Sequence, residues 1–165
     1  MRWKPACPWM LLLILFLAMV AVPTVSAQDP VEPSSSSANS IPESHLIQPA
    51  ALVQLLKAGE KEKPLVLQVG SRVMFSQAHI PGSDYAGPGS QASGTQSLEN
   101  TVSSLPKDKQ IVLYCGCCPW NRCPNVGPAY KRLHDLGFTN VKVLYIANNF
   151  GDDWVNKGYP AIKGK

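Results

Sequence analysis

The chain has 165 residues and a formal net charge of +4, from 15 lysines and arginines against 11 aspartates and glutamates. This length suits one domain with a buried core. The positive charges form no basic run, so the composition argues against a nucleic-acid partner.

The N-terminus has the layout of a secretory signal peptide. Arg2 and Lys4 precede an unbroken apolar stretch from Met10 to Val22, and the Val25–Ala27 segment supplies the small residues of a cleavage site. We expect cleavage of residues 1–27 and export to the periplasm or outright secretion. The alternative is an uncleaved membrane anchor, but the stretch falls short of the about 20 residues that span a bilayer. We therefore expect no stable membrane span after cleavage.

The segment after the signal peptide is polar and rich in Ser and Pro, with the sequence QDPVEPSSSSANS at residues 28–40. Such a composition buries too little apolar surface to fold, so we expect a disordered linker at residues 28–44. The domain is then expected at residues 45–165.

Within that domain, short apolar runs alternate with helical patterns. Strands are predicted at residues 65–69, 111–114 and 141–146, where apolar runs are bounded by turn residues. Helices are predicted from Pro49 up to Gly59, over residues 95–105, and from Pro124 up to Gly137. Buried strands joined by helical crossovers indicate an α/β fold, with a parallel sheet covered by helices on both faces.

Four of the five cysteines lie between Cys115 and Cys123. This cluster cannot link distant parts of the fold, so it indicates a site rather than a framework of structural disulfides. Cys115 directly follows the strand predicted at residues 111–114, and sites in parallel sheets lie beyond the carboxyl ends of strands. The sequence therefore predicts a functional loop that starts at Cys115.

A loop that runs from a strand into a helix N-terminus points backbone N–H groups inward and binds anions. Together with Arg122 and the helix dipole, these groups are expected to favour the thiolate of Cys115. That thiolate would take up a sulfane sulfur, and the same amides would hold the resulting persulfide. The other candidate substrate-binding residues are Gly116, Cys117, Cys118, Trp120, Asn121, Arg122 and Cys123.

The chain resembles the rhodanese (thiosulfate sulfurtransferase) family. The matching segments are VLQV before a loop, AHIPGS at 78–83, IVLYC before the cysteine loop, LHDLGFTNVKVL at 133–144 and DWVNKGYP at 153–160. They cover nearly all of the chain from about residue 47. The resemblance implies a central five-stranded parallel sheet and a persulfide on Cys115. It also implies a small sulfur-containing anion, such as thiosulfate or a persulfide, as the donor and a thiol as the acceptor.

The chain departs from the family pattern at three places. Arg122 stands seven residues after Cys115, a wider spacing than in the commonest family loop. Gln68–Gly70 replaces a usual Asp-Val-Arg, and Asn148–Asn149 replaces a usual glycine pair. Arg72 either stands in for the missing arginine or faces solvent.

The additional thiols Cys117, Cys118 and Cys123 leave three interpretations open. They resolve a disulfide or persulfide on Cys115, or they pair locally, for example Cys118 with Cys123. Alternatively, all four cysteines bind zinc, copper(I) or an iron–sulfur cluster, although their spacing is not the usual pair of knuckles. The alternative interpretation of Cys115 itself is that it is a small residue buried in the core.

Several other side chains have a structural alternative. Arg122 is an anion ligand or a surface residue, and Trp120 lines a substrate mouth or packs on the following helix. We expect His79 to brace a turn, Trp154 to lie in the core or at its rim, and His45 and His134 to be solvated. The leading functional hypothesis is a sulfurtransferase. The alternatives are a non-catalytic metal-binding or sulfur-carrier module, and thiol–disulfide exchange.

Overall fold

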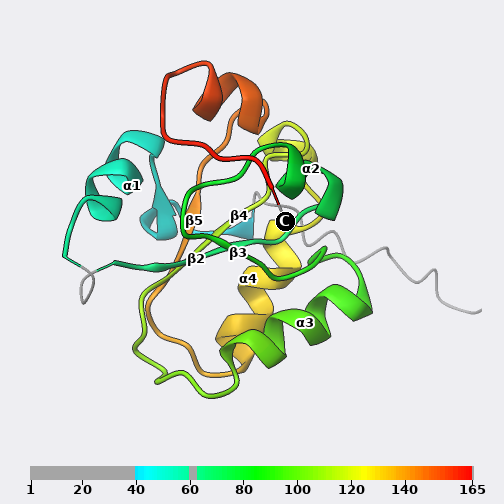
Figure 1. The fold of residues 1–165 in the computed structure, drawn as a ribbon. Coiled ribbons are helices and arrows are strands. Elements are labelled where there is room, and N and C mark those ends of the chain that lie inside the picture. The colour runs from blue at the N-terminus through cyan, green and yellow to red at the C-terminus, as the bar shows by residue number, and fades with distance from the viewer. Residues whose placement is uncertain (1–39, 60–62, 165) are drawn as a thin grey trace, which may run out of the picture. The chain divides into compact units, whose positions relative to one another are not determined.

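The computed structural model describes residues 40–59 and 63–164, which form a five-stranded sheet with the order β1-β5-β4-β2-β3 (Figure 1). Every neighbouring pair of strands is parallel. The strands are β1 (Leu46–Ile47), β2 (Leu65–Gln68), β3 (Asp84–Tyr85), β4 (Ile111–Tyr114) and β5 (Val141–Leu144). The predicted α/β fold and the five strands implied by the family resemblance are confirmed.

Helices occupy most of the connections between the strands. The α-helices are α1 (Pro49–Leu56), α2 (Arg72–Gln77), α3 (Ala92–Val102) and α4 (Val126–Asp135). The 3₁₀ turns are η2 (Glu43–His45) and η3 (Trp120–Arg122), and the π-helix is η4 (Gly151–Val155). In the described part of the chain, no helix is long and apolar enough to cross a membrane.

Both faces of the sheet are buried, because alternate residues of each strand point to opposite sides. On one face, Ile111 and Leu113 of β4 pack with apolar residues of α3 and α4. On the other, Val112 and Tyr114 pack with residues of α1 and η4. Cys115 continues the first alternation and belongs to the core on the α3 and α4 side.

The strongly patterned segments form the predicted elements, with ends that differ from the prediction by a few residues. Strand β4 coincides with its predicted range, while β5 ends at Leu144, before the predicted end. Helix α3 begins at Ala92, ahead of the predicted start at residue 95. The prediction missed β1, β3 and α2, since a two-residue strand shows no alternation and a six-residue helix shows little more than one turn.

The folded domain includes residues before the predicted boundary at residue 45. Ile41 is 6% exposed and belongs to the core on the α3 and α4 side, and Glu43–His45 forms η2. The prediction of a linker over residues 28–44 is therefore wrong for Ile41 and for the η2 residues Glu43 and Ser44, because Ile41 packs in the core. The predicted signal peptide, residues 1–27, and linker residues 28–39 lie outside the described residues.

Candidate functional site: a cluster of four thiols

Strand β4 brings Cys115 to the carboxyl edge of the sheet, and the chain turns at once through Gly116. Gly116 has a φ of +72°, and its carbonyl accepts a hydrogen bond of 3.0 Å from the amide of Phe150. A Cβ at this position would lie 2.6 Å from the Cβ of Phe150. Only glycine fits this turn, because both the backbone angle and the space exclude a side chain.

The four loop cysteines are all free thiols that gather behind this turn. The thiol of Cys115 donates to the sulfur of Cys117 at 3.1 Å, and the sulfur of Cys118 also lies 3.1 Å from that of Cys117. The sulfurs of Cys115, Cys117 and Cys123 all lie within 4.8 Å of one another. The disulfide suggested between Cys118 and Cys123 is not formed in this structure.

Cys115 is more enclosed than the sequence suggested. The residue is only 3% exposed, and Cys123 is 4% exposed, whereas Cys117 and Cys118 are partly exposed. Cys115 also lines a cavity of about 260 Å³ together with Gln68, Met74, Gln77, Ala78, Tyr114, Phe150, Gly151 and Val155. Cys115 is therefore buried in the core on the α3 and α4 side, as in the alternative interpretation of this residue, and it also borders a cavity.

The hydrogen bonds within the cluster favour a thiolate on Cys117 over one on Cys115. Hydrogen bonding with Cys117, then with Cys123, and burial raise the pKa of Cys115. Hydrogen bonds from Cys115 and Cys123 lower the pKa of Cys117 to about 2. The expected thiolate on Cys115 is therefore wrong, since the more exposed sulfur of Cys117 receives the hydrogen bonds that stabilise the charge.

The other two thiols are neutral neighbours of this thiolate. Burial, followed by the hydrogen bond with Cys117, raises the pKa of Cys118 to about 12. The hydrogen bond with Cys115 lowers the pKa of Cys123, but Cys117 and burial raise it, and the net direction is upward. The backbone amides of Asn125 and Val126, at the start of α4, point at Cys123. The amide cradle expected around Cys115 is thus directed at Cys123.

Asn125 is a site residue that the sequence analysis missed. It is 7% exposed, and its side-chain amide donates to Cys115 at 3.4 Å and to Cys117 at 3.8 Å. Its carbonyl oxygen accepts hydrogen bonds from the backbone amide and hydroxyl of Ser90. An Asn before a helix is normally read as a cap, but this side chain makes no cap bond. The sequence feature that could have identified Asn125 is its position directly before the helix that follows the cysteine loop.

The altered segment Gln68–Gly70 forms the wall opposite Cys115. The side-chain oxygen of Gln68 accepts from the amide of Gly70 at 3.1 Å. A Cβ on Gly70 would lie 2.8 Å from both the Cys115 sulfur and the side-chain nitrogen of Gln68. Because residue 70 is a glycine, the Cys115 thiol has room at this position. Arg72 does not replace the lost arginine, because its guanidinium lies over the ring of Tyr85, 4.0 Å from the centroid.

The remaining loop candidates are Trp120, Asn121 and Arg122, which lie in the same loop as the thiols. Trp120 is partly buried, and its ring lies against Tyr145, the residue after β5, with centroids 5.1 Å apart. Asn121 and Arg122 are exposed. Arg122 contacts the cluster through its backbone carbonyl, which accepts a hydrogen bond from the Cys118 thiol at 3.6 Å.

The predicted role is correct for one histidine, His79, and wrong for the other two. His79 braces its turn as expected, because its ring Nδ1 pairs with the carbonyl of Phe75 at 2.8 Å. His45 and His134 are not simply solvated: the hydroxyl of Tyr130 pairs with His45 at 2.5 Å, and the two histidine rings stack. The Nε2 of His134 is buried with no hydrogen-bond partner in the described part of the chain.

Two further predictions concern the chain after β5. Trp154 is fully buried and donates to the carbonyl of Pro160, so it belongs to the core as expected. Asn148 and Asn149, which replace a glycine pair, bind the carboxylates of η4: the amide of Asn148 donates to Asp153, and the side chain of Asn149 donates to Asp152. These bonds hold η4 close to the turn at Gly116.

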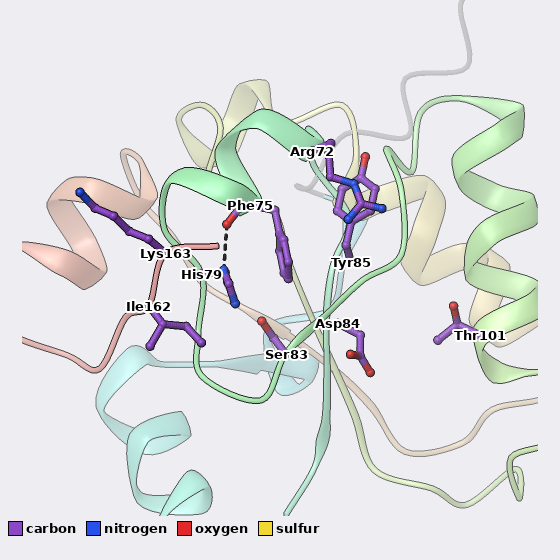
Figure 2. A pocket seen from close by; sticks show the side chains of 9 residues that line it. All are labelled: Arg72, Phe75, His79, Ser83, Asp84, Tyr85, Thr101, Ile162 and Lys163. Atoms are coloured by element: carbon purple, nitrogen blue, oxygen red, sulfur yellow. Dashed lines mark hydrogen bonds between the residues drawn. The ribbon is translucent and has the colours of Figure 1, made fainter. Parts of the chain in front are cut away.

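A second and larger cavity, of about 620 Å³, lies beside β3. Figure 2 shows Phe75 beside His79 and Arg72 over Tyr85 among its lining residues, which also include Asp84. No loop cysteine is among its lining residues, whereas Cys115 lines the smaller cavity.

The comparisons with known proteins agree with this geometry. Residues 48–145 match the family model of the rhodanese-like domain. No match was found among curated proteins. The chain therefore belongs to the rhodanese-like family, whose fold is associated with sulfurtransferase activity.

Solved structures support the same fold. The crystal structure of the BH2092 protein from Bacillus halodurans is 26% identical with a TM-score of 0.56, over 73% of this chain and 77% of that one. The crystal structure of Alr3790 from Anabaena is 21% identical with a TM-score of 0.55, over 72% and 92%. The solution structure of its rhodanese-like domain is 22% identical with a TM-score of 0.54, over 72% and 79%.

Proposed function

We propose that this protein is a sulfurtransferase that moves a sulfane sulfur from thiosulfate or a persulfide to a thiol acceptor through a persulfide on Cys115. The observation that carries the proposal is the 3.1 Å contact between the sulfurs of Cys115 and Cys117. This contact joins a partly exposed thiolate to a buried thiol that lines a cavity.

The first step takes place at Cys117, because its sulfur meets solvent and carries the charge. The thiolate attacks the sulfane sulfur of the donor, and the donor leaves as sulfite or as a thiolate. Cys117 then carries a persulfide, and the net charge is conserved. Asn125 donates to this sulfur and stabilises the anion.

The second step passes the sulfur to Cys115. The Cys115 thiol, which faces the Cys117 sulfur at 3.1 Å, passes its proton to the outer sulfur of the Cys117 persulfide. The Cys115 sulfur then attacks that outer sulfur, and Cys117 leaves as a thiolate. A thiol of low pKa is the better leaving group, and one of higher pKa is the stronger nucleophile. The lowered pKa of Cys117 therefore makes it a good leaving group in this step.

The cavity of about 260 Å³ beside Cys115 provides room for the added sulfur. Met74, Ala78, Phe150 and Val155 give it a mainly apolar lining, which suits a small uncharged thiol as the acceptor. The acceptor thiolate attacks the outer sulfur of the Cys115 persulfide, leaves with it, and returns Cys115 to its thiol form after protonation.

Mass spectrometry of the reduced protein after donor treatment tests this sequence of steps. We expect wild type to gain one sulfur on Cys115, Cys115→Ser to hold the sulfur on Cys117 without turnover, and Cys117→Ser to take up sulfur at least about tenfold more slowly. Sulfate, which has the same charge as thiosulfate but no sulfane sulfur, is the control donor. The proposal fails if wild type gains no sulfur on either residue, or if both variants turn over at the wild-type rate.

Thiol–disulfide exchange is the second candidate, because the same 3.1 Å contacts place Cys117 between two thiols. In that case an oxidised partner would convert the pair into a disulfide without sulfur uptake. Intact mass under non-reducing conditions separates the two functions, since a disulfide lowers the mass and a persulfide raises it.

We also propose that the protein is exported, on the basis of the apolar segment from Met10 to Val22. N-terminal sequencing of the protein recovered from its host should begin at Gln28. A chain that starts at Met1 and remains with the cytoplasmic fraction would contradict export.

A further inference from the structure

We propose that Cys115, Cys117 and Cys123 form a three-sulfur binding site for copper(I). This inference goes beyond sulfur transfer and does not depend on it, because it uses a thiol, Cys123, that the transfer steps leave idle. The proposal is based on the distances between the three sulfurs, on the hydrogen-bond donors around them, and on a ligand group that consists of cysteines alone.

The three sulfurs come from different segments and converge. Cys115 follows β4, Cys117 lies in the loop, and Cys123 directly follows η3. Their sulfurs all lie within 4.8 Å of one another. A thiolate lies about 2.3 Å from a bound metal ion of this size, so sulfurs that share one ion are about 4 Å apart. The observed triangle needs only small movements to reach that spacing.

The donor set is soft. The group consists of three cysteines and contains neither carboxylate nor imidazole among the described residues. Thiolate ligands select copper(I), zinc and iron–sulfur clusters over harder ions. Cys115 and Cys123 are 3% and 4% exposed, so water has little access to two of the three sulfurs.

The number of sulfurs favours copper(I) over zinc. Structural zinc sites have four protein ligands in a tetrahedron, whereas copper(I) is satisfied by two or three sulfurs. The fourth loop thiol, Cys118, lies outside the group of three. Its sulfur lies 3.1 Å from that of Cys117 and 3.6 Å from the carbonyl of Arg122.

The surroundings offset the negative charge of the ligands. Each thiol that binds the ion releases its proton to solvent, so three thiolates and copper(I) carry two net negative charges. The side-chain amide of Asn125 donates to Cys115 and Cys117, and the amides that begin α4 point at Cys123. Such donors around a metal site orient the ligands and stabilise them.

Anaerobic titration of the reduced full-length protein with copper(I), in competition with a colorimetric copper(I) chelator, tests the site. We expect one copper per chain in wild type. Cys115→Ser, Cys117→Ser and Cys123→Ser should each weaken binding at least about tenfold, while the matched variant Cys118→Ser should bind as wild type does. The same titration with zinc should show weaker competition.

Binding of no copper by wild type overturns the proposal. So does an equal loss in Cys118→Ser, which would make Cys118 a ligand, and so does tighter binding of zinc. If a buried Cys→Ser variant fails to fold by circular dichroism, X-ray absorption of the copper-loaded wild type decides the question: a shell of sulfur alone is expected, and oxygen or nitrogen ligands would overturn the site.

Sulfur uptake is measured separately on metal-free protein in the presence of a chelator. Copper binding without sulfur uptake would leave this site intact and remove the proposed function. Sulfur uptake without copper binding would remove this site and leave the proposed function intact. If both occur, one equivalent of copper(I) should block uptake in wild type by occupying Cys117.

Discussion

The side-chain amide of Asn125 donates to the sulfur of Cys115 at 3.4 Å and so connects the start of α4 with the end of β4. The same amide reaches Cys117 at 3.8 Å. Since the carbonyl of Asn125 is held by Ser90, the side chain can present only its nitrogen to the thiols. Asn125 is therefore a positioning residue for the thiol pair.

Substitution Asn125→Asp tests this role. The shape of the side chain and the acceptor for Ser90 remain, but the donor toward the thiols is replaced by a charged oxygen. Hydrogen bonds to charged groups contribute about 1.5–3 kcal/mol, so we expect sulfur uptake to fall about tenfold or more, with a higher midpoint in its pH profile. The exposed Asn100→Asp is the matched control. A wild-type rate and pH profile in Asn125→Asp would contradict the assignment.

Substitution Gly70→Ala should push the Cys115 thiol out of place. The new Cβ would lie 2.8 Å from that sulfur and from the side-chain nitrogen of Gln68. Forcing an atom into a packed interior typically costs about 1–3 kcal/mol, so we expect this loss of stability together with slower sulfur uptake. Urea unfolding and persulfide mapping measure the two effects.

Gly59→Ala is the control for that change, because a Cβ there meets no atom within 4 Å and its φ is not in the left-handed region. Its stability should stay within about 0.5 kcal/mol of wild type. Equal effects of the two substitutions would show that residue 70 has no particular contact with the thiol.

Substitution Tyr114→Phe should destabilise the fold. The Tyr114 hydroxyl accepts from the backbone amide of Ile80 at 3.2 Å and pairs with the hydroxyl of Ser83 at 3.0 Å. Burial raises the pKa of Tyr114 to about 12, so the hydroxyl stays neutral at physiological pH. Its removal leaves a buried amide without a partner, and we expect a loss of about 1–3 kcal/mol in urea unfolding.

Tyr145→Phe provides the comparison, since the Tyr145 hydroxyl has no hydrogen bond within the described residues and the ring only packs against Trp120. It should change stability little. A Tyr114→Phe protein as stable as Tyr145→Phe would mean that the Ile80 amide finds another partner.

His134 should make the stability of the fold depend on pH. Burial, followed by the nearby His45, lowers the pKa of His134, while Asp135 acts in the opposite direction. The other titratable side chains in contact with it are the stacked ring of His45 and the ring of Tyr130, whose hydroxyl pairs with His45. The unfolded chain therefore binds the proton more readily than the folded chain does.

A lowered histidine pKa makes the folded state less stable as the pH falls below the unfolded value of about 6.5 and down through the folded value. Urea unfolding at a series of pH values should show this decline in wild type and a flatter curve in His134→Gln. Parallel curves for the two proteins between neutral and mildly acidic pH would exclude His134 as the source.

The apolar patterns of the sequence determined the α/β class, the strand β4 and the position of Cys115 at its end. These features are local: a short apolar run between turn residues specifies a buried strand, and the next residue must then lie at the carboxyl edge of the sheet. For the same reason the cysteine loop could be located without coordinates.

Only the tertiary structure decided which sulfur carries the charge and how the thiols are surrounded. Asn125 and Gly70 come from separate segments and meet Cys115 only because β2 and β4 pair and α4 packs on the sheet. The pKa of a thiol depends on burial and on its neighbours in space. Spacing along the chain therefore identified the cluster, while three-dimensional packing made Cys117 the thiolate and enclosed Cys115.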